Sequence, residues 1–161
     1  MTNSGLTVLT NPHPELRRVS AAVTSADLAS KETQAFIDQL EIAMREFDGV
    51  GIAAPQVGDK RRIIVALIGG RAQTFVNPEL VSKSFRTAMG EEGCLSVPGV
   101  YGLVKRCRTV KVKALTRDGA PVELDCGGLE AVIFQHEIDH LDGILFIDKV
   151  EKFTSAGRSK L

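Results

Sequence analysis

The chain has 161 residues, of which 43% are hydrophobic and 25% charged, and its 20 Lys and Arg residues balance 20 Asp and Glu residues. These values fit one globular domain over residues 1–161, and no apolar run approaches the roughly 18 residues that a membrane-spanning helix needs. A net charge of zero gives no support for a nucleic-acid partner, whose phosphates are neutralised by clustered Lys and Arg, so we expect neither a nucleic-acid nor a membrane contact.

Three cysteines, Cys94, Cys107 and Cys126, make an odd count with no paired spacing. That pattern argues against a disulfide framework and favours a reducing compartment. The start of the chain also lacks a basic stretch followed by a long apolar run, so the sequence predicts no secretory signal. We therefore expect a cytoplasmic protein in which Cys107 and Cys126 are small core or near-surface residues.

Two elements are predicted before the first glycine-rich segment. Residues 8–18 contain Pro12 and Pro14, and two prolines this close favour an extended or turned arm over a helix. From roughly residue 25 to residue 48, apolar side chains recur at three- and four-residue steps, which places them on one face of a helix. Gly49 suits the end of that helix, because glycine readily adopts the left-handed conformation that often closes one.

The middle of the chain predicts strands, some with runs of β-branched residues and others with alternating apolar and polar side chains. The basic residues between 105 and 113 are interpreted as the solvated face of a strand. Turns are expected at Gly69-Gly70 and Asp118-Gly119. The predicted strands cover residues 62–68, 73–76, 80–85, 109–116 and 122–125, with Asn77-Pro78 between the second and the third.

A second helix is predicted from Gly127-Gly128 to Asp142-Gly143. Residues 151–161 are polar and are expected to fray. Helix, strands and helix follow one another without regular βαβ alternation. We therefore predict an α+β fold with one N-terminal helix, in which antiparallel or mixed sheets pack around the helix of the C-terminal half. One face of that second helix carries Leu129, Val132, Ile133, His136 and His140.

The strongest chemical signal is the sequence HEIDH at 136–140. Residues four apart stack on one face of a helix, so His136 and His140 can converge on one cation. Glu137 lies beside them without being needed as a ligand, and it can take a proton from a metal-activated water. The alternative is a pair of core histidines on an amphipathic helix, which a pattern of this specificity disfavours.

A catalytic site of this kind takes a third protein ligand and keeps one position open for water. The residues themselves offer two candidates, the thiolate of Cys94, within EEGCLS at 91–96, and the carboxylate of Glu151 downstream. Cys94 taken alone is also compatible with a buried structural thiol. The choice of the third ligand therefore stays open at the level of residue types and spacing.

A glycine-rich segment, GVGIAAPQ at 49–56, precedes both of these motifs. Glycine lets a ligand approach the backbone closely, and Gln56 can direct an amide donor toward a developing oxyanion. The segment is not a phosphate-binding loop, because no Lys-Ser or Lys-Thr pair follows it. It also lacks the strand-to-helix context and the acidic residue of a dinucleotide-binding fold.

Taken together, these segments resemble those of peptide deformylases. GVGIAAPQ at 49–56, EGCLS at 92–96 and QHEIDHLDG at 135–143 occur in the order, and at roughly the spacing, of that family. The arm PHPELR at 12–17 is also similar, with His13 in place of the family's usual Asp. The resemblance runs from about residue 8 to residue 150, and the three motifs in combination are far more specific than any one of them.

The resemblance implies hydrolytic removal of the formyl group from the N-terminal formyl-methionine of newly synthesised proteins, with release of formate. It implies that metal-bound water attacks the formyl carbon with Glu137 as general base and acid. The Gln56 side chain and the Leu95 backbone N–H would stabilise the oxyanion. It also implies one divalent metal ion, natively Fe(II) with Zn, Ni or Co as substitutes, bound by Cys94, His136 and His140.

Substrate contacts are expected beside the metal. Leu129, Val132 and Ile133, one to two turns before the first histidine of the motif, are predicted to line a pocket for the methionine side chain, although a core role fits them as well. Gly51 is expected to let the substrate backbone pair with a strand edge. The expected partners are nascent formyl-methionyl peptides. Some relatives dock on the ribosome through a long C-terminal helix, which the roughly eleven residues after Val150 do not predict.

Two other functions are compatible with the helical motif alone. A zinc metallopeptidase of the HExxH type would cut internal amide bonds, whereas a non-catalytic fold would use the metal only structurally. Release of formate from a formylated peptide, and its dependence on Glu137, separate both of these from a deformylase.

Overall fold

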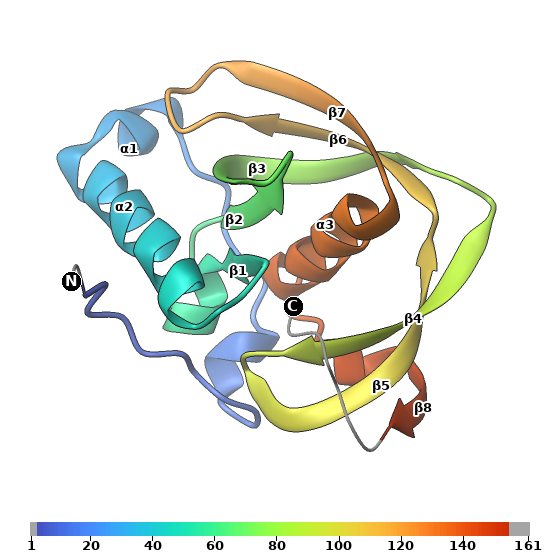
Figure 1. The fold of residues 1–161 in the computed structure, drawn as a ribbon. Coiled ribbons are helices and arrows are strands. Elements are labelled where there is room, and N and C mark those ends of the chain that lie inside the picture. The colour runs from blue at the N-terminus through green and yellow to red at the C-terminus, as the bar shows by residue number, and fades with distance from the viewer. Residues whose placement is uncertain (1–2, 155–161) are drawn as a thin grey trace.

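The computed structural model describes residues 3–154, and Figure 1 shows two sheets with a helix of the C-terminal half between them. This arrangement confirms the predicted α+β fold class. The helices are α1 (Ser25–Ala29), α2 (Lys31–Glu46) and α3 (Gly128–Leu141). The larger sheet has the order β1 (Gly51–Ala53), β2 (Ile63–Ile68), β3 (Arg71–Lys83), β6 (Thr109–Leu115) and β7 (Pro121–Gly127). The smaller sheet has the order β4 (Thr87–Cys94), β5 (Val97–Cys107) and β8 (Val150–Thr154), and the strand pairs of both sheets are antiparallel.

Alternation along β2 places α2 and α3 on opposite faces of the larger sheet. Ile63 and Val65 lie in one core cluster with α2, whereas Ile64 and Ala66 lie in another with α3. Successive strand residues point to opposite faces, so a strand that is buried on both faces reads as a continuous apolar run. The apolar run after Arg62 is therefore a strand with both faces covered. Its two edges are also paired, with β1 and with β3.

Helix α3 is fixed in the middle of the molecule by its apolar side chains. Phe134 is fully buried and meets Phe75 of β3 edge to face, with ring centroids 4.9 Å apart. An aromatic pair of this geometry contributes about 0.5–1.5 kcal/mol beyond its buried area. On the opposite side α3 contacts β5 of the smaller sheet. Helix α3 therefore contacts both sheets, and Figure 1 shows its orange-red ribbon between them.

The helix predicted from residue 25 to residue 48 is divided in two. Ser30 is extended, with ψ of 145°, and its hydroxyl accepts a hydrogen bond from the Thr33 N–H at 3.1 Å, which caps α2. Thr24 caps α1 in the same way. Ser and Thr side chains compete with a helix by bonding the backbone locally, so the apolar periodicity does not reveal this break. None of the helices within residues 3–154 has the length and apolar character that crossing a membrane requires.

Strand β3 joins two strands that are separate in the sequence prediction. It bends where Asn77 takes a positive φ of 50° and where the pairing with β6 shifts register between Val76 and Glu79. The Asn77 side chain accepts a hydrogen bond from Val23 N–H at 2.8 Å and donates one to Val23 C=O at 2.9 Å. Asn77-Pro78 therefore makes an irregularity within one strand, and the Asn77 side chain also anchors the segment before α1 at Val23.

The smaller sheet differs most from the sequence prediction. The hairpin of β4 and β5 has no predicted counterpart, because β4 contains glycine and adjacent glutamates and lacks regular apolar alternation. The expectation of a frayed tail is wrong for residues 151–154, which pair with β5 as part of β8. Residues 155–161 of that tail lie outside the described residues.

Candidate metal centre

The three predicted metal ligands lie together. His136 and His140 are one turn apart on α3, with ring centroids 5.0 Å apart, and Cys94 ends β4. All three side chains are buried, and their ligand atoms lie within 4.8 Å of one another. The Sγ atom of Cys94 is 3.2 Å from His140 Nε2, a contact across 46 positions of the chain. The hairpin of β4 and β5 thus delivers the third ligand to α3.

Glu151, the other candidate for the third ligand, lies away from this cluster. It belongs to β8, its side chain is 51% exposed, and it pairs with Lys105 Nζ at 3.2 Å. Of the two candidates, the structure therefore brings only Cys94 to the histidines.

The clustered donor atoms of Cys94, His136 and His140 fit a metal ion. His136 Nδ1 lies 2.9 Å from Glu92 Oε2, so the ring has its Nε2 left for a ligand, and within residues 3–154 that buried atom has no hydrogen-bond partner. Buried polar atoms are nearly always paired, so an unpaired one marks a position where something binds. A thiolate with two imidazoles is a donor set that zinc, iron and other first-row ions accept.

A buried ion network supports the histidines from behind. Arg106 donates to Glu92 at 2.8 and 3.0 Å and to Asp139 of α3 at 2.6 Å. The Arg106 side chain is only 5% exposed, so the interpretation of residues 105–113 as a solvated strand face is wrong for Arg106. That interpretation is confirmed for Lys111 and Lys113. Neither Glu92 nor Arg106 is among the site residues that the sequence predicts. The signal for Arg106 is its place two residues after the buried Val104 on β5, since alternate strand residues share a face.

The network changes the acid–base properties of the groups around the ligands. Burial alone would raise the pKa of Glu92, but hydrogen bonds from Arg106 and His136 lower it to about 2. Burial alone would lower the pKa of His136, but Cys94 and Glu92 raise it to about 10. The pKa of His140 is well below its ordinary value, because of burial and the neighbouring His136. A metal ion needs neutral imidazole donors, so its binding would release the His136 proton.

Glu137 lies between the two histidines in sequence and is fully buried. Neither of its carboxylate oxygens has a hydrogen-bond partner among the described residues. Burial raises its pKa to about 7, against the opposing effect of His136. A carboxyl group with a pKa near neutral pH can both accept and return a proton, which is the property of a general base and acid.

Gln56 presents its amide donor to the same cluster. It lies on the short helix η2 (Ala54–Val57), and its Oε1 accepts a hydrogen bond from Ala53 N–H at 2.9 Å. That bond turns the Nε2 group toward Cys94 Sγ at 3.6 Å and Ser96 Oγ at 3.2 Å. Leu95, the other predicted oxyanion donor, directly follows Cys94 and is half-buried. Both predicted oxyanion donors therefore lie beside the three predicted metal ligands.

A cavity of about 470 Å³ opens between α3 and the hairpin of β4 and β5. Its walls include Glu92, Met89, Leu129 and Val132. Two of the three predicted pocket residues therefore line a cavity that borders the ion network. Ile133 is not part of this wall: it is buried in the core cluster between α3 and the larger sheet, which fits the core role that its sequence position also allows.

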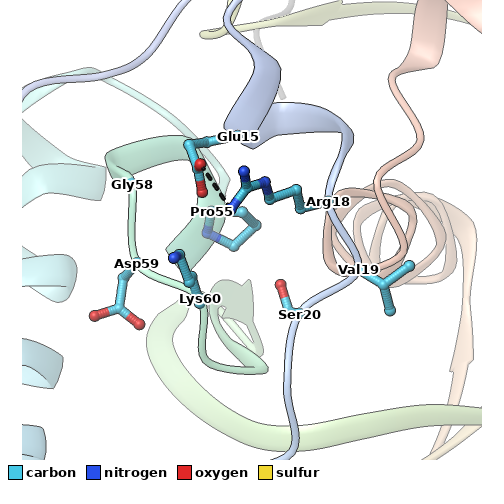
Figure 2. A pocket seen from close by; sticks show the side chains of 8 residues that line it. All are labelled: Glu15, Arg18, Val19, Ser20, Pro55, Gly58, Asp59 and Lys60. Carbon is cyan, nitrogen blue, oxygen red and sulfur yellow. Dashed lines mark ion pairs between the residues drawn. The ribbon is translucent and has the colours of Figure 1, made fainter.

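Of two other hollows of the described surface, one reaches the predicted metal ligands and one does not. A groove of about 550 Å³ includes Cys94, Leu95 and Tyr101 in its wall and so also reaches the three predicted metal ligands. Figure 2 shows a smaller pocket, of about 40 Å³, beside η1 (Pro14–Arg17), where an ion pair joins Glu15 and Arg18. That pocket contains none of the predicted site residues, and the predicted irregular arm supplies one of its walls.

Comparison with known proteins agrees with the motifs and the fold. The family model described as polypeptide deformylase matches residues 6–156. The chain is 44% identical over 146 residues to peptide deformylase 2 of Xanthomonas axonopodis pv. citri, with 89% of this chain and 85% of that protein covered. It is also 44% identical over 149 residues to peptide deformylase 1 of Bacillus subtilis, with 91% and 90% covered.

A solved structure gives the same result for the fold. The class I type b peptide deformylase from Acinetobacter baumannii with bound Met-Ala-Ser has a TM-score of 0.87 at 39% identity, with 90% of this chain and 98% of that chain covered. The family match includes all three motifs, and sequence identity and backbone similarity extend over about nine tenths of the chain. The chain therefore belongs to the polypeptide deformylase family, whose members are metal-dependent amide hydrolases.

Proposed function

We propose that this chain removes the formyl group from the N-terminal formyl-methionine of newly synthesised proteins and releases formate. The observation that carries the proposal is a fully buried carboxylate without a hydrogen-bond partner, Glu137, on the helix that presents two of the three clustered donors. A zinc metallopeptidase is disfavoured, because the family match extends over residues 6–156 and includes the glycine-rich and cysteine motifs, which HExxH alone does not require.

Cys94, His136 and His140 would hold one divalent ion, expected to be Fe(II), and the same donors accept Zn, Ni or Co. When bound, the metal supplies Lewis-acid chemistry, which lowers the pKa of water and polarises a carbonyl oxygen. Glu92 would keep His136 in the tautomer that offers Nε2 as the donor.

The protein groups then move one proton and stabilise one charge. Glu137 accepts a proton from the attacking water and returns it to the departing amine, and a pKa near 7 suits both steps. The Gln56 amide and the Leu95 N–H donate hydrogen bonds to the oxygen that becomes negatively charged. Because Gln56 is already held by Ala53, its donor needs little reorganisation during the reaction.

The methionine side chain would occupy the cavity of about 470 Å³ lined by Leu129 and Val132. Leu129 is 55% exposed and lies where a side chain can enter from solvent. The peptide backbone would run past Gly51 at the start of β1. The Acinetobacter baumannii relative with bound Met-Ala-Ser supports a peptide that begins with methionine as the product. Such substrates are nascent chains, so we expect the enzyme to act in the cytoplasm.

The decisive experiment measures formate released from formyl-Met-Ala by the reduced, metal-loaded protein, with unformylated Met-Ala-Ser as the second substrate. We expect formate release and no cleavage of the unformylated peptide. Glu137→Gln should lower kcat by about 10²- to 10⁴-fold, because the amide cannot accept the proton. Its metal content should equal that of the wild type. Cleavage of the unformylated peptide without formate release would instead support the metallopeptidase.

A further inference from the structure

Gly51 touches the carboxylate of Glu137 more closely than any larger residue could. A Cβ atom built on Gly51 would overlap Glu137 Oε1 and would lie 2.8 Å from Cδ and 2.9 Å from Cγ. Carbon atoms in favourable contact are separated by about 3.5–4.0 Å. The space next to the Gly51 backbone is therefore filled by the whole carboxylate group and not only by the end of a side chain that could swing away.

The backbone conformation does not explain the glycine. Gly58, Gly69 and Gly70 have a φ between 58° and 83°, a region that strongly favours glycine. Gly51 is not among the positive-φ glycines of the described chain. It is an ordinary strand residue, paired with Ala66 of β2. A residue with a side chain could adopt this conformation, so the requirement comes from the contact with Glu137.

Neither side of this contact can easily retreat. Behind Gly51, the next residue Ile52 is fully buried in the core cluster that contains α2. Behind Glu137, α3 is held by Phe134, which packs on Phe75. Close-packed interiors resist such shifts, so an added methyl group at position 51 would displace the carboxylate itself.

We propose that Gly51 is a positioning residue for Glu137: its missing side chain leaves the space that the carboxylate occupies, and β1 is the wall that holds it beside Cys94, His136 and His140. This inference rests on the proposed role of Glu137 as general base. It differs from the expectation that Gly51 serves the substrate backbone, because it assigns the glycine to the protein's own proton carrier.

The test begins with Gly51→Ala in the metal-loaded protein. A methyl group would move the carboxylate by roughly 1 Å, and a displacement of that size can lower kcat about 10²-fold. We expect that loss in kcat, a KM changed by less than about threefold, and an unchanged metal content. Gly127→Ala is the matched control, because a Cβ there would meet its nearest atoms at 3.7 and 3.9 Å, which is ordinary contact. Its kcat should equal that of the wild type.

A second measurement tests the contact without using activity. The overlap should lower the Tm of Gly51→Ala by roughly 5 °C when Glu137 is present. In a Glu137→Ala background the space is empty, so the same substitution should lower the Tm by less than about 2 °C. If Gly51→Ala fails to fold, the double variant should fold, since the overlapping group is gone.

Three results would overturn the inference. The first is a higher KM with unchanged kcat, which would make Gly51 a substrate contact only. The second is an equal loss of Tm in both backgrounds, or a double variant that fails to fold as well. The third is a Gly51→Ala enzyme with the kcat of the wild type. The Tm comparison remains valid if the wild-type protein releases no formate, so a failure of the proposed function is recognised separately.

Discussion

Glu92 determines which nitrogen of His136 faces the predicted metal site. Its carboxylate oxygen lies 2.9 Å from Nδ1, so that nitrogen keeps its proton and Nε2 is the nitrogen that would give up its proton to bind a metal ion. A carboxylate in this position also makes the imidazole a stronger electron donor and fixes the ring orientation. Glu92 therefore acts on the predicted site without being a ligand.

Replacing this carboxylate should weaken metal binding. We expect Glu92→Gln to lower metal affinity about 10- to 100-fold, because the amide neither carries the charge nor fixes the tautomer as firmly. Competition with a chelator of known affinity measures this change. Glu151→Gln serves as control, since Glu151 pairs with Lys105 on the surface, and it should bind metal as the wild type does. Equal affinities for the two variants would contradict the role assigned to Glu92.

Strand β5 connects the two elements that carry the predicted ligands. Arg106, on β5, donates hydrogen bonds to Glu92 on β4 and to Asp139 on α3. Asp139 is also bonded by Lys149 at 2.8 Å. The guanidinium is suited to this position, because its planar fork binds one carboxylate with two hydrogen bonds and still reaches a second.

Removal of the guanidinium should destabilise the fold. In Arg106→Met the Glu92 charge stays buried without its main partner, a change that typically lowers the free energy of unfolding by about 3–5 kcal/mol. Urea unfolding measures the difference. The neighbouring Lys105 lies on the exposed face of β5. Lys105→Met should therefore change the free energy of unfolding by no more than about 0.5 kcal/mol. If both variants unfold at the same urea concentration, the network does not stabilise the join between β5 and α3.

A buried ion network joins the smaller sheet to α3, and this gives the whole molecule a dependence on pH. The pKa of Glu92 falls from its ordinary value of 4.5 to about 2 through Arg106 and His136. A depressed pKa means that the unfolded chain binds the proton more readily than the folded one does. The stabilisation by Glu92 is therefore complete above about pH 4.5 and is lost as the pH falls toward 2.

The free energy of unfolding should therefore decline by roughly 3 kcal/mol between pH 4.5 and pH 2 because of this one group. Unfolding curves recorded through that range, with a chelator present throughout, isolate the effect from metal release. Glu92→Gln should be less stable at neutral pH and should show a flatter acid limb. An acid limb as steep as that of the wild type would assign the dependence to other carboxyl groups.

Local patterns predicted the parts of the protein that depend on neighbours in sequence. The four-residue spacing of His136 and His140 places them on one helix face whatever surrounds them, because the α-helical period is a property of the backbone. The apolar run of β2 and the alternation of β6 were predicted for the same reason. The break at Ser30 was missed, since a cap and a helical interior differ by a local hydrogen bond that periodicity does not contain.

The sequence by itself determined the α+β class, the pairing of His136 and His140, the adjacent carboxylate of Glu137 and, through three motifs in combination, the family, whose resemblance implied Cys94 as the third ligand. Only the tertiary structure showed Cys94 and not Glu151 at the histidines, turned Arg106 inward and placed Gly51 against Glu137. These three results depend on contacts between residues far apart in the chain. Such contacts form when sheets and helices pack together, and the period of a single segment carries no information about them.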